Sequence, residues 1–240
     1  MRLLILALLL ATPAEEALEK ADKLAAAARA APLDRQAKAV DEALAAYDAV
    51  IAMRPKDEKL VPRVRRRRAS LLRIAGRPKE AIAEYDRILD GRARRKDKAR
   101  ALRDAAALLE RGGDFAAAEA RLARVLDEYG DDIRACAAAG LARGRVLEKM
   151  ARPADAAKCY RFVVEKCRDE AEAMIASYDA LALLAIARKD LAEAEGWLRS
   201  CRKQFEKRAT RGDRYGAFVS RLLGSMKAPA ALAKARTEGG

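Results

Sequence analysis

The stretch DEALAAYDAV at residues 41–50 decides the fold, because its pattern occurs five times along the chain. The other four copies are KEAIAEYDRI (79–88), AAEARLARV (117–125), DAAKCYRFV (155–163) and EAEGWLRSC (193–201). The small residue that opens the copies is Ala43, Ala81, Ala118, Ala156 and Ala194 in turn, which gives successive intervals of 38, 37, 38 and 38 residues. A constant period of this length predicts a stacked array of one repeated helical unit.

Each copy has the spacing of one face of an α-helix. A bulky residue lies four positions after the opening alanine, and a smaller apolar residue follows three positions later. Side chains at such intervals form a single stripe along a helix, so we expect them in the core. The bulky residues are Tyr47, Tyr85, Leu122, Tyr160 and Leu198.

A second amphipathic stretch precedes each of the last four copies, and turn-forming residues separate the two. Glycine favours the C-terminal end of a helix, whereas proline and aspartate favour the start of the next one. The predicted turns are residues 76–78, 112–114, 151–153 and 188–190. The predicted first helices are residues 63–75, 99–111, 134–150 and 174–187. The repeated unit is therefore a helical hairpin.

The composition also favours an all-α fold. Of the 240 residues, 52% are hydrophobic, much of this share being alanine, and only 5% are aromatic. Alanine loses almost no side-chain entropy in a helix and lets helices approach closely. Runs of alternating β-branched and aromatic residues, which strands need, are missing.

The unit resembles the tetratricopeptide repeat (TPR), a helical hairpin with a small residue early in its second helix, an aromatic residue four positions later and often a closing proline. Ala43, Tyr47, Val50 and Pro55 match this series in full, and Gly144 lies where the family favours a small residue in the first helix. The third and fifth copies carry leucine in place of the aromatic residue. The period of 37–38 exceeds the family's usual 34, so we expect helices or connections about one turn longer.

The resemblance covers about residues 15–207 and implies a right-handed α-solenoid that ends in a capping helix. We expect a repeat domain over residues 15–227 and a flexible tail at 228–240. The expected units lie at about residues 15–56, 60–97, 98–133, 134–171 and 172–207, with the capping helix at 213–226.

The first 14 residues have the pattern of a secretory signal peptide. A basic start, a short apolar run at residues 3–11 and small residues lie before Glu15 and Glu16. We therefore expect export to the periplasm or outside the cell, with cleavage after Ala14 or, as second choice, after Ala11. The apolar run is about half of the ~20 residues that a spanning helix needs, so we expect no stable membrane span. The alternative is that these residues form the first turns of a buried helix.

Charge and resemblance together predict a protein or peptide partner with acidic groups. The chain has 50 Lys and Arg against 36 Asp and Glu, a net charge of +14. In TPR proteins the first helices line a concave groove that holds partner peptides, which implies a partly basic groove here. Arginine pairs well with carboxylates because its planar fork can bind both oxygens. The candidate groove residues are Arg63, Arg66, Ser70, Arg73, Arg100, Arg103, Arg145 and Lys149.

Two qualifications follow from helix geometry. The four consecutive arginines at 65–68 must point around most of a helix, so the alternative for this run is a solvated face. Glu110 and Glu148 lie near the face of the candidate residues and would neutralise part of the groove.

We expect neither an enzyme nor a cofactor or metal site. The chain has no histidine, which removes the commonest general base and the usual zinc ligands, and it has no glycine-rich phosphate loop. The predicted function is a non-catalytic scaffold for protein–protein interaction in the cell envelope or the secreted space. The alternatives are a polyanion or nucleic-acid binder that uses the arginine-rich helix, and a structural subunit of an envelope complex. We do not favour nucleic acid, because aromatic residues for base stacking are scarce.

The four cysteines lie at positions 136, 159, 167 and 201 without any C-x-x-C spacing, which gives little support to a zinc or thioredoxin-like site. In a hairpin, the start of the first helix lies beside the end of the second. Cys136 and Cys167 occupy these places, so they are the candidate disulfide, with Cα atoms less than ~7 Å apart. The alternative is that cysteines serve as small buried apolar residues.

Overall fold

The structure is a computed structural model that describes residues 12–53, 55 and 57–238. The predicted all-α fold is confirmed for this part of the chain, which forms helices and no strand. The helices are α2 (Pro13–Ala30), α3 (Leu33–Ala52), α4 (Leu60–Ile74), α5 (Pro78–Asp90), α6 (Arg95–Arg111), α7 (Phe115–Glu128), α8 (Ile133–Lys149), α9 (Pro153–Lys166), α10 (Ala171–Ala187), α11 (Leu191–Ala209), α12 (Arg214–Gly224) and α13 (Ala228–Glu238).

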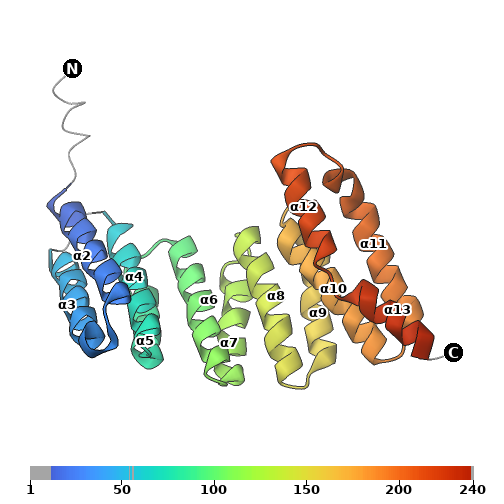
Figure 1. The fold of residues 1–240 in the computed structure, drawn as a ribbon, viewed down its shortest axis with the longest axis horizontal. Coiled ribbons are helices and arrows are strands. Elements are labelled where there is room, and N and C mark those ends of the chain that lie inside the picture. The colour runs from blue at the N-terminus through green and yellow to red at the C-terminus, as the bar shows by residue number, and fades with distance from the viewer. Residues whose placement is uncertain (1–11, 54, 56, 239–240) are drawn as a thin grey trace, which may run out of the picture. The chain divides into compact units, whose positions relative to one another are not determined.

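The chain divides into two compact units, each built from helical hairpins (Figure 1). In unit 1, residues 1–108, α2 packs on α3 and α4 packs on α5, and α4 also contacts both helices of the preceding hairpin. In unit 2, residues 109–240, α8 packs on α9 and α10 packs on α11. Helix α10 also contacts α8, so the first helices of successive hairpins lie side by side.

The turn inside a hairpin has one recurrent geometry. The second residue after the first helix adopts a positive φ, and the amide of the following residue donates to a carbonyl oxygen five residues earlier, at 2.9–3.0 Å. This is the Schellman motif, which satisfies carbonyl groups at a helix end. The residues with positive φ are Gly76, Gly113, Ala151 and Lys189. The second helix then begins at a proline or after an aspartate whose side chain caps it, namely Pro78, Pro153, Asp114 and Asp190.

The repeated apolar stripe forms the core. The side chains of Tyr47, Tyr85, Leu122 and Tyr160 are buried, as predicted, with at most 6% of each residue exposed. The fifth copy differs, because Leu198 is only half-buried.

The small residue on the first helix of the fourth hairpin allows close contact with the second helix. A Cβ atom added to Gly144 would lie 2.3 Å from Cε1 of Tyr160, whose ring is fully buried. The Tyr160 hydroxyl also donates a hydrogen bond to Glu148 of α8. Gly144 is therefore required by packing rather than by backbone conformation.

The C-terminal segment differs from the prediction. The flexible tail expected at residues 228–240 is wrong for residues 228–238, which form α13 and pack on α10 and α11. The backbone amides of Lys227 and Ala228 donate to Asp179 of α10 at 2.9 and 2.8 Å, and Ala228 and Leu232 are buried. The capping element therefore consists of two helices, α12 and α13.

At the other end, α2 begins with a capping box. Thr12 accepts from the Glu15 amide and Glu15 accepts from the Thr12 amide, which satisfies donors at the helix start. The apolar run of the predicted signal peptide, residues 3–11, lies outside the described residues. No helix in the described ranges is both long and apolar enough to cross a membrane.

We predict opposite effects for two glycine-to-alanine substitutions in helix interiors. Gly144→Ala should lower the free energy of unfolding by about 1–3 kcal/mol, because the new methyl group overlaps the Tyr160 ring. Gly196→Ala in α11 should raise it by about 0.5–1 kcal/mol, because nothing lies within 4 Å of the new methyl group and alanine favours the helix. Urea unfolding followed by circular dichroism measures both changes. Equal effects of the two substitutions would contradict the packing argument.

Candidate partner-binding site

The arginine run at residues 65–68 points in several directions, as its consecutive spacing requires. Arg65 and Arg68 both bind Glu84 of α5, whose side chain is 1% exposed. Arg87, one turn further along α5, binds the same carboxylate. One buried carboxylate thus holds three guanidinium groups, so these arginines stabilise the hairpin rather than form a free basic surface.

The other two arginines of the run face neighbouring helices. Arg67 forms an ion pair with Asp22 of α2, and the Tyr47 hydroxyl donates to the same carboxylate at 2.9 Å. Arg66 lies on the side of α4 that faces α6, where the charges of Arg100 and Asp104 influence its pKa. The alternative of a purely solvated face is therefore wrong for most of the run.

Arg66 is part of a basic cluster in unit 1, which we define as Arg66 and Arg73 of α4 with Arg100 and Arg103 of α6. All four lie within electrostatic reach of Asp104 or Tyr85. Arg100 Nε lies 3.8 Å from a carboxylate oxygen of Asp104, the acidic residue that shares α6 with it. Arg73 and Arg100 are exposed, whereas Arg66 and Arg103 are half-buried.

Burial is the main cause of the pKa shifts in this cluster, and the neighbouring charges modify them. Burial lowers the pKa of Arg66, and the positive charge of Arg100 lowers it further, against the opposing effects of Asp104 and Asp97. Burial also raises the pKa of Asp104, although three arginines oppose this shift. Tyr85 has a pKa raised to about 12, mainly by burial and then by Asp104, so its hydroxyl stays neutral. Arg66 and Arg100 therefore repel each other, and burial disfavours the charged forms of both Arg66 and Asp104.

The other two predicted groove residues on α4 are Arg63 and Ser70. Arg63 is half-buried, and its positive charge acts on Glu15 of α2 rather than on α6. Its Nε atom is buried without a hydrogen-bond partner in the described part of the chain. Ser70 is half-buried, between the positions of Arg66 and Arg73 on α4.

The two predicted groove residues of α8 belong to unit 2. Lys149 Nζ binds Glu110 at 2.8 Å and lies 5.7 Å from the centre of the Phe115 ring, so the expected neutralisation by Glu110 is present. Arg145 is exposed and acts electrostatically on Tyr160. The structure thus brings together the four arginines of the basic cluster, whereas Lys149 forms a separate ion pair with Glu110.

Sequence reasoning missed Asp104 and Tyr85 as members of the cluster, and it missed Glu84 as the centre of the neighbouring ion pairs. Tyr85 was recognised in the sequence as the bulky residue of the second copy, and the repeat pattern explained it fully as a core residue. Asp104 and Glu84 had no signal, because nothing in their spacing relates them to arginines on another helix.

Three solved structures share this arrangement of helices. The structure of a Podosopora anserina putative kinesin light chain with nearly identical TPR-like repeats has a TM-score of 0.56 and 18% identity, over 85% of this chain and 100% of that one. Pseudomonas aeruginosa pilF has a TM-score of 0.53 and 15% identity, over 91% of each chain. MamA has a TM-score of 0.51 and 18% identity, over 73% of this chain and 94% of that one.

The chain has the TPR-like repeat fold. The predicted resemblance is therefore confirmed by structure, at identities too low to carry more than the fold. No protein-family model and no curated protein sequence matches this TPR-like chain.

The cysteines of the TPR-like chain are buried free thiols, so the candidate disulfide between Cys136 and Cys167 is not formed in the structure. Cys136 donates to the Tyr129 carbonyl oxygen at 3.4 Å. Burial raises the pKa of Cys167 to about 11, and Cys136 contributes to the shift, so the two residues are neighbours. Among residues 12–53, 55 and 57–238, no group of three or more Cys, Asp and Glu residues is arranged to hold a metal ion.

We predict that Glu84→Gln lowers the free energy of unfolding by about 3 kcal/mol. The substitution leaves the partly buried charge of Arg65 without its counter-charge and leaves Arg68 with only the more exposed Asp48. The matched control is Glu80→Gln on the same helix. Glu80 also binds an arginine, Arg77, but its side chain is 54% exposed, so we expect little change. Urea unfolding measures both, and a loss no larger for Glu84→Gln than for the control would contradict the role of the buried carboxylate.

Proposed function

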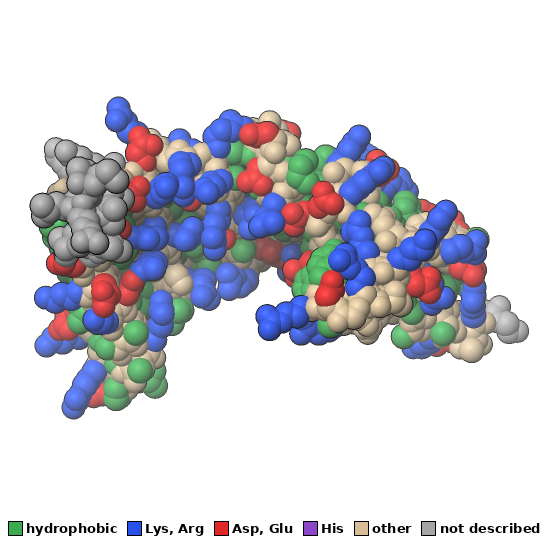
Figure 2. All heavy atoms as spheres, turned by 90° about the horizontal axis from the view of Figure 1, so that it is seen from above, with side chains coloured by type: hydrophobic (Ala, Val, Ile, Leu, Met, Phe, Trp, Pro, Cys, Tyr) green, Lys and Arg blue, Asp and Glu red, His purple; other side chains and the backbone are tan. Residues whose placement is uncertain are grey.

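We propose that the protein is a non-catalytic scaffold that binds an acidic segment of another protein at the basic cluster of unit 1. The observation that carries this proposal is the gathering of arginines from α4 and α6. Arg66, Arg100 and Arg103 act electrostatically on Asp104, and Arg73 acts with Arg66 and Arg100 on Tyr85. Figure 2 shows Lys and Arg side chains over much of the visible surface, with Asp and Glu among them.

The arrangement suits a carboxylate ligand for an electrostatic reason. Arg73 and Arg100 are exposed and can meet a partner first, while the half-buried Arg66 and Arg103 keep positive charge beneath them. A partner carboxylate placed between α4 and α6 would offset the repulsion between Arg66 and Arg100. Hydrogen bonds between guanidinium and carboxylate groups are among the stronger ones in proteins.

The alternative of a polyanion or nucleic-acid binder has the net charge of +14 in its favour. Many of the arginines, however, bind acidic residues of the same chain, as Arg65, Arg67 and Arg68 do. A structural role in a larger complex, without use of the basic cluster, is the remaining alternative.

We also propose that the protein is exported, on the basis of the signal-peptide pattern at its N-terminus. The two candidate cleavage sites differ in their consequence for α2. Cleavage after Ala11 keeps Thr12 and its capping box, whereas cleavage after Ala14 removes Thr12 and the buried Ala14. Loss of a threonine cap costs about 1 kcal/mol of helix stability.

The partner-binding proposal is tested by affinity capture from extracts with the double variant Arg73→Glu, Arg100→Glu. We expect a discrete partner that the parent protein retains and the variant loses, because two attractive charges become repulsive. The matched control is Arg35→Glu, Lys38→Glu on α3, which changes the charge of the same unit by the same amount at exposed positions. The control should retain the partner.

Other outcomes of the capture decide against the proposal. Retention of the partner by both variants would place the binding surface elsewhere and favour a structural subunit. Recovery of nucleic acid alone, with steep salt dependence, would favour the polyanion alternative.

Export is tested by the N-terminal sequence and the mass of the chain recovered from the envelope and the medium. We expect a chain that begins at Glu15 or at Thr12, depending on which cleavage site is used. A chain that still begins at Met1 and is found only inside the cell would contradict export.

A further inference from the structure

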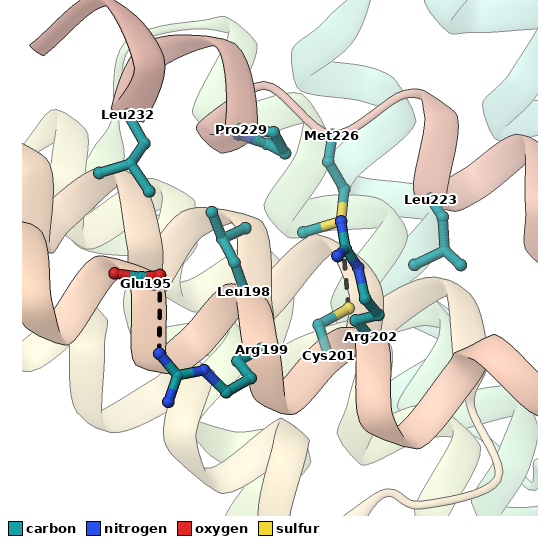
Figure 3. A pocket seen from close by; sticks show the side chains of 9 residues that line it. All are labelled: Glu195, Leu198, Arg199, Cys201, Arg202, Leu223, Met226, Pro229 and Leu232. Carbon is teal, nitrogen blue, oxygen red and sulfur yellow. Dashed lines mark hydrogen bonds and ion pairs between the residues drawn. The ribbon is translucent and has the colours of Figure 1, made fainter. Parts of the chain in front are cut away.

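A cavity of about 370 Å³ lies in unit 2 between α11, α12 and α13 (Figure 3). Its volume falls within the range of about 300–1,000 Å³ that is typical of small-molecule sites. It lies within unit 2, whereas the basic cluster belongs to unit 1. The partner-binding proposal therefore does not explain it.

Six of the nine residues that line the cavity are apolar. Cys201 and Leu232 are buried in its wall, while Leu198, Leu223 and Met226 remain half-buried because no protein atoms fill the space beside them. The sixth apolar residue of the lining is Pro229. Burial raises the pKa of the Cys201 thiol to about 12, so this wall carries no charge at neutral pH.

The walls are held by specific contacts on both sides. Asp179 of α10 accepts from the first amides of α13, and Arg236 near the end of α13 binds Glu195 of α11 at 2.8 Å. On the α12 side, Val219 is fully buried in the core. The cavity is therefore bounded by anchored helices rather than by a loose terminus.

The rim of the cavity is positively charged. Glu195 is the one acidic residue of the lining, and it is already shared by Arg236 at 2.8 Å and Arg199 at 3.6 Å. Arg202 also lines the cavity, and it forms no ion pair within the part of the chain that the structure describes. Among the lining residues, Arg199 and Arg202 against Glu195 leave a net charge of +1 at the opening.

We infer that this cavity binds an aliphatic carboxylate, with its hydrocarbon chain among the leucines and its carboxylate at Arg202. The apolar wall excludes a strongly polar ligand, and the charge at the rim selects an anion over a cation. A neutral apolar cavity of about 150 Å³ can hold benzene, so the present volume has room for a chain on the order of ten carbons.

The test is calorimetric titration of the full chain with decanoate, decanol and decylammonium below their aggregation concentrations. We expect one decanoate per chain, weaker binding of decanol and little binding of decylammonium. Octanoate should bind about fifteenfold more weakly than decanoate, because it lacks two CH₂ groups and each buried CH₂ group lowers the dissociation constant about fourfold. A decanoate with a photoreactive diazirine should crosslink to α11, α12 or α13.

Three surface variants locate the carboxylate. Arg202→Gln should raise the Kd of decanoate about fivefold, as loss of an exposed ion pair implies. Lys203→Gln, at the neighbouring exposed position outside the lining, should leave it unchanged. The double variant Arg73→Glu, Arg100→Glu should also leave it unchanged, which separates this site from the basic cluster.

Four results would overturn the inference, three of which concern the cavity itself. These are equal affinity for decylammonium and decanoate, no effect of Arg202→Gln, and crosslinks confined to helices outside α11–α13. Loss of decanoate binding in the unit 1 double variant would likewise show that the acid binds the basic cluster instead.

Discussion

The hairpin depends on the close approach of its two helices, which requires a small residue on one helix wherever a ring lies on the other. Gly144 and Tyr160 show this constraint most directly, because even a methyl group at position 144 would overlap the ring. In the second helix, Ala156 is fully buried one turn before Tyr160. Alanine-rich helices provide such surfaces throughout the chain, and the thin core that results buries little area for each residue.

Because the core is thin, charged residues take a direct part in holding the hairpins together. Glu84 is enclosed by three arginines in unit 1, and Asp22 receives both Arg67 and the Tyr47 hydroxyl. Part of the positive charge of the chain is thus paired with acidic residues of the same chain. Positive charge that is not paired within the chain is concentrated where two arginines lie close together, as Arg66 and Arg100 do. Such places attract an anion because the like charges repel each other.

The last repeat differs from the others in a way that connects its packing to its proposed chemistry. Leucine replaces the aromatic residue at position 198, and it remains half-buried at a cavity that α12 and α13 enclose without filling. In the fourth copy the equivalent Tyr160 packs fully against a neighbouring helix. Leu122 of the third copy is also a leucine and is buried, so the space beside Leu198 depends on α12 and α13, which line it without filling it.

The sequence by itself determined the repeated hairpin, the positions of the turns and the buried stripe, because periodic spacing and turn chemistry are local properties. Gly76 and Pro78 mark a turn wherever they occur in such a pattern, and Tyr160 lies on the apolar face of its helix whatever surrounds it. Only the tertiary structure decided which arginines bind acids and which face each other. It also decided that residues 228–238 fold, because Asp179, 48 residues before Lys227, supplies the acceptor for their first amides. The physical reason is that ion pairs and caps between distant segments depend on how helices stack, and side-chain spacing along one helix does not contain that information.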